Sequence, residues 1–202
     1  MSNKKQALLV VVSAPSGAGK TTLCNGLLDE FTKMARSISC TTREKRRGEV
    51  DGKDYFFISE DTFTKRMERG DFLEYALVHG HRYGTPREPV EKLLAAGRDV
   101  LMAIDVQGAQ QIRDKAIAAP PDSLLRKGFV DIFVIPPSRQ VLKQRLIARG
   151  QDRPDDIRRR LIGAAKELAR MHEFKYRVVN DDLDTALDAL RCIVRAEHLR
   201  LQ

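Results

Sequence analysis

A glycine-rich turn at residues 14–22, Ala-Pro-Ser-Gly-Ala-Gly-Lys-Thr-Thr, has the residue types and spacing needed to bind a polyphosphate. It follows an apolar run at 7–12 and precedes helix-forming residues at 23–28, the strand, turn and helix that a phosphate-binding P-loop requires. Gly17 and Gly19 lack a Cβ, so the backbone can curve with its N–H groups facing an oxyanion at the positive end of the helix. The alternative is a glycine-rich turn that binds nothing, which this context disfavours.

Two side chains at the end of the turn complete its chemistry. We expect Lys20 to reach the β- and γ-phosphates and the Thr21 hydroxyl to join the ligands of a bound Mg²⁺. Ala14 stands where the first glycine of the P-loop pattern is usual, but the phosphate-facing amides and the lysine remain. The expected triphosphate site comprises Ala14, Pro15, Ser16, Gly17, Ala18, Gly19, Lys20, Thr21 and Thr22.

The composition limits the classes of protein to which this chain can belong. With 202 residues, 42% of them hydrophobic, it can bury one substantial core with small appended lobes. The longest apolar run is far below the roughly 18 residues of a membrane span, and the first predicted strand leaves no room for a signal peptide. Cys24, Cys40 and Cys192 are odd in number and widely spaced, which argues against a disulfide framework and a metal cluster. We expect a cytoplasmic protein with no membrane partner.

A formal net charge of +8 could indicate a nucleic-acid partner. Much of the basic charge falls into two clusters, 43–47 and 145–160, and a protein that holds two phosphorylated ligands needs such clusters. The sequence has no basic stripe interleaved with aromatic residues on which single-stranded nucleic acid would stack. We therefore expect no nucleic-acid partner.

Alternating apolar runs and amphipathic segments predict an α/β protein with a mostly parallel sheet. Strands are expected at 7–13, 99–104, 130–135 and 176–180, and helices at 20–33, 86–96, 106–115, 138–148, 154–172 and 183–200. Ser138 is expected to cap the helix that follows it. Residues 85–88, Thr-Pro-Arg-Glu, match a capping box with proline at the first helical position.

Three stretches interrupt this alternation. Residues 36–85 carry short β-like pieces separated by turns, so we expect a small mixed lobe inserted into a core of residues 1–35 and 86–202. Residues 144–160 are rich in arginine and broken by a glycine and a proline, which favours a mobile helical lid. Residues 116–128 are expected to form a surface loop.

Taken together, the motifs resemble those of the guanylate kinase family over about residues 8–200. Beyond the turn they are Thr-Thr-Arg at 41–43, Gly-Glu-Val-Asp-Gly-Lys-Asp-Tyr-Phe-Phe at 48–57, Phe-Leu-Glu at 72–74, Tyr-Gly-Thr at 83–85, Ile-Asp-Val-Gln-Gly at 104–108 and Val-Asn-Asp-Asp at 179–182. The resemblance implies a P-loop NTPase three-layer fold with a parallel sheet core, a GMP-binding inserted lobe and a helical lid. It implies phosphoryl transfer from ATP to GMP with Mg²⁺, in guanine nucleotide biosynthesis and recycling. ATP and GMP are the partners it implies, and a homo-oligomer is also compatible with the sequence.

The residues that the resemblance assigns to the GMP phosphate make chemical sense. Arg43 and Arg46 would hold the 5′-phosphate, because a guanidinium fork matches its oxygens. Tyr55 and Tyr83 are similar to the family tyrosines that donate hydroxyls to the same phosphate. The alternatives are a solvated turn for the arginines and packing alone for Tyr55.

Glu74 is the residue that we expect to select the base. Its carboxylate can accept two adjacent hydrogen bonds, and guanine offers N1–H and the N2 amine side by side, whereas adenine presents an acceptor at N1. Ser39 and Thr85 resemble the family's hydroxyl contacts on the O6 side, and Asp105 resembles the aspartate on the amine side. Capping of the helix that follows is the alternative for both Thr85 and Asp105.

The donor side rests on fewer residues. The expected catalytic residues are Lys20, Arg43, Arg145, Arg149 and Arg160. The last three resemble lid arginines that neutralise charge during transfer. Asn180 resembles the family's contact to the adenine, and the alternative is an asparagine that merely ends a strand. We expect direct in-line attack by a GMP phosphate oxygen, which is already anionic and needs no catalytic base.

Two departures from the family and two histidines bear on the site. Ala103 stands where the family commonly has an acidic residue, so Mg²⁺ would be bound without that carboxylate, and the segment 116–128 is longer than usual. His79 and His81 have no partner cluster and are expected on a loop surface. The other functions considered are an inactive module that binds a phosphorylated peptide, a P-loop kinase with another acceptor, and a P-loop protein acting on nucleic acid.

Overall fold

The computed structural model describes residues 6–78, 80–148 and 153–200. Its core is a five-stranded sheet in the order β2-β7-β1-β8-β9, in which every neighbouring pair is parallel. The strands are β1 (Leu9–Ser13), β2 (Ala35–Arg36), β7 (Val100–Ala103), β8 (Phe129–Ile135) and β9 (Tyr176–Val179). The central strand β1 is a continuous buried apolar run that ends in a serine, as expected for a strand covered on both faces. The predicted α/β fold with a parallel sheet is confirmed, and β2 is a strand that the sequence did not indicate.

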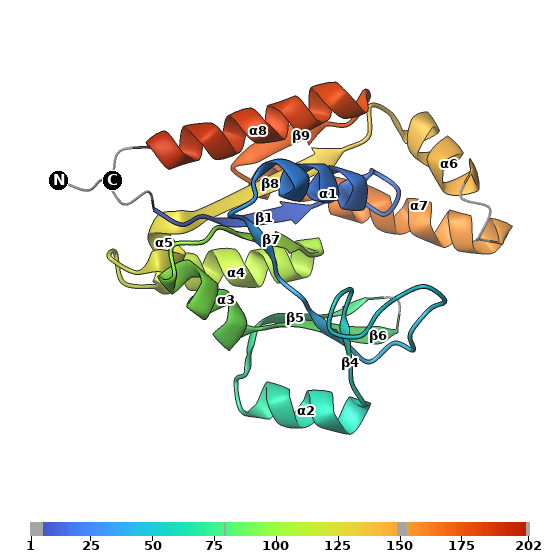
Figure 1. Ribbon diagram of the computed structural model, residues 1–202. Helices are drawn as coiled ribbons and strands as arrows, with labels where there is room; N and C mark the ends of the chain where they lie inside the picture. Colours follow the sequence, from blue (N-terminus) through green and yellow to red (C-terminus); the bar gives the residue numbers. More distant parts are fainter. Residues whose placement is uncertain (1–5, 79, 149–152, 201–202) are drawn as a thin grey trace.

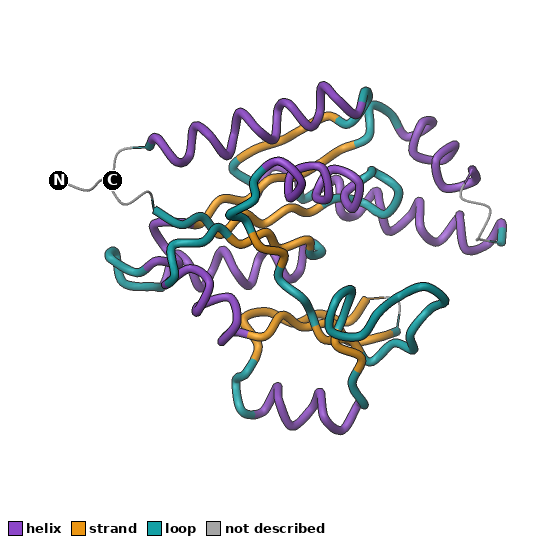
Figure 2. Tube along the Cα trace, in the orientation of Figure 1, coloured by secondary structure: helices purple, strands orange, loops and turns teal. Residues whose placement is uncertain are grey.

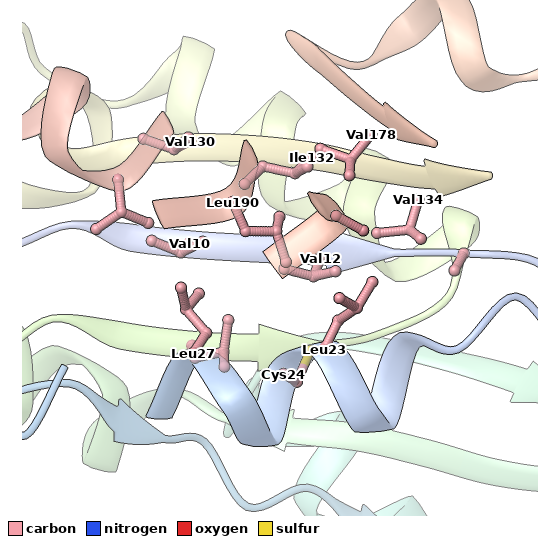
Figure 3. Close-up of a cluster of buried hydrophobic side chains, with 14 of the residues drawn as sticks. Val10, Val12, Leu23, Cys24, Leu27, Val130, Ile132, Val134, Val178 and Leu190 are labelled. Atoms are coloured by element: carbon pink, nitrogen blue, oxygen red, sulfur yellow. The ribbon is translucent and has the colours of Figure 1, made fainter. Parts of the chain in front are cut away.

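Helices cover both faces of this sheet, which gives three layers (Figure 1). On one face lie α1 (Lys20–Glu30) and α8 (Leu183–Leu199), and on the other lie α3 (Arg87–Ala95) and α4 (Val106–Ala118). Alternate residues of β1 point to opposite layers. Val10 and Val12 pack with Leu23 and Leu27 of α1 and Leu190 of α8 (Figure 3). The side chains of β1 thus contribute to the hydrophobic core on both sides of the sheet.

A second, mixed sheet forms from the chain between β2 and α3, in the order β4-β3-β6-β5. Its strands are β3 (Cys40–Thr41), β4 (Phe56–Phe57), β5 (Phe72–Val78) and β6 (His81–Pro86). Most of the chain between β3 and β4 is loop (Figure 2). The helix α2 (Glu60–Glu68) covers this sheet, with Phe63 stacked on Phe72 at a centroid distance of 4.6 Å. Helix α4 packs on β5 of this sheet as well as on β1 and β8 of the core (Figure 1).

Three local sequence signals can be compared with the structure. The Ser138 cap is confirmed, because its Oγ accepts a hydrogen bond from Val141 N at 3.1 Å. The capping box at 85–88 is wrong: Thr85 lies in β6, and α3 starts at Arg87 without a side-chain cap. Residues 116–128 are not simply a loop, because α4 continues to Ala118 and α5 (Leu124–Gly128) follows a cap at Ser123. In both errors a tertiary contact or a second cap outweighed the local pattern.

The expected lid, 144–160, spans the end of α6 (Arg139–Ala148) and the start of α7 (Pro154–Ala169). Leu142 and Leu146 of α6 pack with Ala164 of α7 in a small separate core. A short 3-10 helix, η1 (Met171–Glu173), follows α7. Among the helices that the structure describes, none combines the length and apolar character needed to cross a membrane.

A buried ion pair ties α4 to the core sheet, and we expect its loss to destabilise the fold. Asp131 in β8 accepts hydrogen bonds from Arg113 Nε at 2.9 Å, from Arg113 Nη2 at 2.6 Å and from Lys175 N at 2.9 Å. Arg113→Met should lower the free energy of unfolding by about 3 kcal/mol, because it leaves the Asp131 charge buried without its cation. Denaturant unfolding measures the change, with the exposed Arg98→Met as the control. Equal midpoints for the two variants would contradict the prediction.

Candidate active site

Three groups of the expected site residues lie at the carboxyl ends of the core strands. The glycine-rich turn follows β1, Asp105 follows β7, and Asn180 follows β9. This edge of an open parallel sheet is where ligands bind in α/β proteins. The second sheet reaches the same place, because Glu74 of β5 lies against Gly108 near the start of α4.

The turn adopts a conformation that glycine permits. Gly17 and Gly19 both have φ of +93°, in the left-handed region that L side chains rarely adopt. A Cβ on Gly19 would lie 2.2 Å from Asn180 Nδ2, which donates to the Ala18 carbonyl at 2.7 Å. The buried Asn180 therefore holds the turn by a hydrogen bond from the end of β9. It lies at the end of a strand, as in the alternative considered for it. Its contact with adenine stays a prediction.

Helix α6, which carries the start of the expected lid segment, lies close to the same turn. A Cβ on Gly17 would lie 3.0 Å from both Leu142 Cδ1 and Leu146 Cδ2. Arg145 donates from Nη1 to the Asn180 carbonyl at 2.8 Å. The expected lid segment thus lies next to the turn at Gly17 and contacts the end of β9.

Lys20 extends from the start of α1 across the end of β7. Its Nζ donates to the Ile104 carbonyl at 2.7 Å. Burial lowers the pKa of this ammonium, while the carboxylates of Asp105, Glu167 and Glu74 act in the opposite direction. The Lys20 ammonium group lies between the turn and the start of α4, where it could contact a polyphosphate held at the turn.

Glu167 of α7 belongs to this cluster, although the sequence did not single it out. Its carboxylate lies close enough to the backbone N–H of Ser16 in the turn for that group to lower its pKa. Burial raises the pKa of Glu167, and the Lys20 charge opposes that rise. The backbone N–H groups of such a turn attract anions, and the Glu167 carboxylate is one. Because α7 carries several charged residues, only its packing against the turn distinguishes this one.

Of the two other arginines expected as catalytic residues in the lid segment, the structure describes one. Arg160 Nη1 lies 3.3 Å from Ser16 Oγ. Arg149 lies outside the described residues. A hollow of about 380 Å³ opens beside the turn, and it is lined by Gly17, Gly19, Thr22, Arg145, Ala148, Asn180, Asp181 and Leu183. It is continuous with the turn, because Gly17, Gly19 and Thr22 of the turn form part of its lining.

A second cationic group lies in the small sheet and the loop between β3 and β4. Arg43 donates from Nη2 to Glu49 at 2.7 Å and from Nε to the Tyr83 hydroxyl at 3.3 Å. The bond to Glu49 raises the pKa of Arg43, and the guanidinium lies 5.7 Å from the ring centroid of Tyr55. Arg43 is thus an ordered side chain rather than a solvated turn residue. Arg46 is exposed, and its backbone N–H donates to Glu49 at 2.8 Å.

Glu74 is the first residue of a short chain of side-chain hydrogen bonds. Its side chain is almost fully buried, and Thr85 Oγ1 donates to its Oε1 at 2.5 Å. Ser39 Oγ lies 3.0 Å from the same Thr85 oxygen. Because the single hydroxyl proton of Thr85 goes to Glu74, Ser39 must donate to Thr85. Burial raises the pKa of Glu74 to about 7, although the bond from Thr85 lowers it.

Asp105 caps α4, which is the alternative role that we considered for it. Its Oδ1 accepts a hydrogen bond from Gly108 N at 2.9 Å, and its Oδ2 accepts one from Gln107 Nε2 at 3.0 Å. Its charge raises the pKa of the nearby Glu74, so the two carboxylates share one electrostatic environment. Contact between Asp105 and a guanine amine stays a prediction.

The residues available for a metal fit Mg²⁺ that arrives with a nucleotide. Thr21 is exposed in the first turn of α1, and Ala103 at the end of β7 offers no ligand atom from its side chain. Within the described ranges, no cluster of three His, Cys, Asp or Glu residues could hold a metal. Mg²⁺ takes hard oxygen ligands, commonly one or two from protein with the rest from phosphates and water.

The expected loop position of His81 is wrong, because it begins β6, and His79 lies outside the described residues.

Comparison with known proteins gives one consistent result. A family model described as guanylate kinase matches residues 6–197. A guanylate kinase from Symbiobacterium thermophilum is 46% identical over 200 residues, which cover 99% of this chain and 90% of that protein. One from Caldanaerobacter subterraneus is 44% identical and covers 100% and 93%. The crystal structure of guanylate kinase from Anaplasma phagocytophilum matches with a TM-score of 0.77 and 32% identity, covering 97% of this chain and 88% of that one.

Proposed function

This chain belongs to the guanylate kinase family, and from that membership we propose that it transfers the γ-phosphoryl group of ATP to GMP, and also to dGMP. The observation that carries the choice of acceptor is the hydrogen-bond chain from Ser39 through the buried Thr85 to the buried Glu74. A buried carboxylate leaves an acceptor ready for the two adjacent donors of guanine. Adenine would place a lone pair against it and leave a buried polar group unpaired.

The mechanism that we propose uses position and charge rather than a catalytic base. The turn amides and Lys20 would hold the ATP phosphates, and Arg43 with Tyr83 would hold the GMP phosphate and screen the repulsion between the two anions. A GMP phosphate oxygen would attack the γ-phosphorus in line as the bond to the ADP oxygen breaks. Thr21 would hold Mg²⁺, which supplies further charge neutralisation on the phosphates. The lid arginines, Arg145 and Arg160 among them, would add positive charge as the lid closes.

A coupled assay of ADP formation tests this function directly. It should compare GMP, dGMP, AMP, CMP and UMP as acceptors, with ATP and Mg²⁺ present. We expect turnover with GMP and dGMP and little with the others, because only guanine offers both donors to Glu74. Turnover that depends on another monophosphate would refute the acceptor assignment. Turnover stimulated by DNA, with no monophosphate, would favour an action on nucleic acid.

Affinity for GMP is expected to rise with pH. The pKa of Glu74 lies at about 7, so its carboxyl is mainly protonated below that pH and mainly ionised above it. The ionised form accepts both guanine donors, and the protonated form accepts fewer, so the KM for GMP should fall by several-fold from about pH 6 to about pH 8. In Glu74→Gln only the GMP phosphate, with a pKa near 6, still titrates. The same pH dependence in both proteins would contradict the assignment.

A further inference from the structure

We propose that one face of α4, formed by Gly108, Gln111 and Lys115, is a clamp that positions Glu74 for guanine recognition. The inference rests on the proposed function and names residues that determine its specificity. The three clamp residues follow one another at spacings of three and four, so they share one side of the helix. Each of them engages one of three consecutive residues of β5, at 73, 74 and 75.

Gln111 holds the strand just after Glu74. Its Oε1 accepts a hydrogen bond from Tyr75 N at 3.1 Å, and its Nε2 donates to the Tyr75 carbonyl at 2.6 Å. β5 is the last strand of its sheet, so these two backbone groups face away from β6. The amide of Gln111 thus acts as a short extra strand on an otherwise open edge. These two hydrogen bonds fix the position and the orientation of the backbone next to Glu74.

Lys115 holds the strand just before Glu74. The pairing of β5 with β6 shifts register between Phe72 and Glu74, which is the irregularity of a β-bulge. A bulge redirects a side chain and leaves one residue out of the ladder. Lys115 Nζ donates to the carbonyl of Leu73, the residue in that shift. It also brings a positive charge close enough to Glu74 to lower the pKa of that carboxyl.

Gly108 sets how closely the helix approaches the carboxylate. A Cβ at this position would lie 2.4 Å from Glu74 Oε2, closer than real contacts allow. The same residue donates its N–H to Asp105 Oδ1 at 2.9 Å, so it joins the helix cap to the base site. Helix α4 therefore meets Glu74 at its carboxylate and at the backbone on both sides. Ile104, two residues before the first residue of α4, accepts the hydrogen bond from Lys20, so the segment that leads into α4 connects the surroundings of Glu74 to the P-loop.

The test replaces each polar clamp residue with methionine, which keeps length and removes hydrogen bonding. Gln111→Met and Lys115→Met should each raise the KM for GMP about tenfold, the effect of losing one or two hydrogen bonds. The KM for ATP should stay unchanged, because the P-loop lies outside the clamp, and the preference for GMP over AMP should fall. Gln140→Met on α6 and Lys92→Met on α3, both exposed, are the matched controls and should behave as wild type.

A pH profile separates positioning from a general loss of structure. Lys115→Met should move the pH dependence of the GMP KM to higher pH, because it removes a cation that lowers the pKa of Glu74, while Lys20 and Asp105 remain unchanged. Arg87 is the other cation near Lys115 and is unchanged. Lys115→Arg should restore the wild-type profile, and Gln111→Met should not shift it. Unfolding midpoints of all the variants are measured alongside.

Two outcomes would overturn the inference. Wild-type KM for GMP in both methionine variants would show that the clamp does not position Glu74. Parallel increases in the KM for ATP and for GMP, with a lower unfolding midpoint, would show a structural role alone. Failure of the proposed function is a separate result, because it would appear as the absence of GMP-dependent turnover in the wild-type protein before any variant is compared.

Discussion

Lys20→Met is expected to lower the kcat of GMP phosphorylation by about 10³-fold or more. The Lys20 Nζ lies 2.7 Å from the Ile104 carbonyl, next to the glycine-rich turn. Burial lowers the pKa of Lys20, and the nearby carboxylates of Asp105, Glu167 and Glu74 oppose that lowering. Charge on the transferring phosphoryl oxygens is stabilised by such fixed cations, and water cannot replace one in a closed site. Methionine keeps the length of the side chain and removes the charge.

Single-turnover kinetics with saturating ATP and GMP would measure this loss on the chemical step. Lys33→Met, at an exposed position after α1, is the control and should retain wild-type kcat. Unfolding midpoints confirm that both variants are folded. A kcat within tenfold of wild type for Lys20→Met would mean that the glycine-rich turn does not hold the reacting phosphates.

Glu74→Gln is expected to lower kcat/KM for GMP by about 10³-fold. The amide has nearly the same shape, but it presents one acceptor and one donor where guanine requires two acceptors. One of its atoms must also receive the hydroxyl proton of Thr85, which bonds Oε1 at 2.5 Å in the wild type. The amide oxygen cannot serve both partners well, so a guanine donor is left facing the NH₂ group. The loss should fall on GMP, with the KM for ATP unchanged.

The folding stability of Glu74→Gln should not fall together with its kcat/KM for GMP. This difference separates an effect on guanine recognition from an effect on folding. The folded-state pKa of Glu74 is raised to about 7, so the folded protein binds more protons than the unfolded chain between the two pKa values. Stability therefore falls as pH rises through that window. Glutamine removes this dependence, and Glu74→Gln should be at least as stable as wild type at pH 8. Glu68→Gln, exposed on α2, is the control for both measurements. Lower stability with wild-type kcat/KM would reverse the interpretation.

Several features could be predicted from the sequence because local chemistry determines them. The positions of Gly17 and Gly19 follow from backbone sterics, and both adopt the positive φ that only glycine takes readily. The apolar runs predict the core strands because a strand covered by helices on both faces must be apolar throughout. Ser138 caps its helix with a bond to a backbone N–H three residues along, so no distant residue is needed.

Other features depended on the tertiary structure because their local signals fit two roles. Thr85 has the pattern of a cap, but its hydroxyl bonds Glu74, eleven positions away along the chain. Nothing local marks Glu167 or Gln111, whose partners in the turn and in β5 lie far away in the sequence. A polar side chain at a helix surface is compatible with solvent, with an ion pair or with a distant backbone group. Which of these it meets is decided by the packing of the helix, because burial removes the water that would otherwise satisfy both partners.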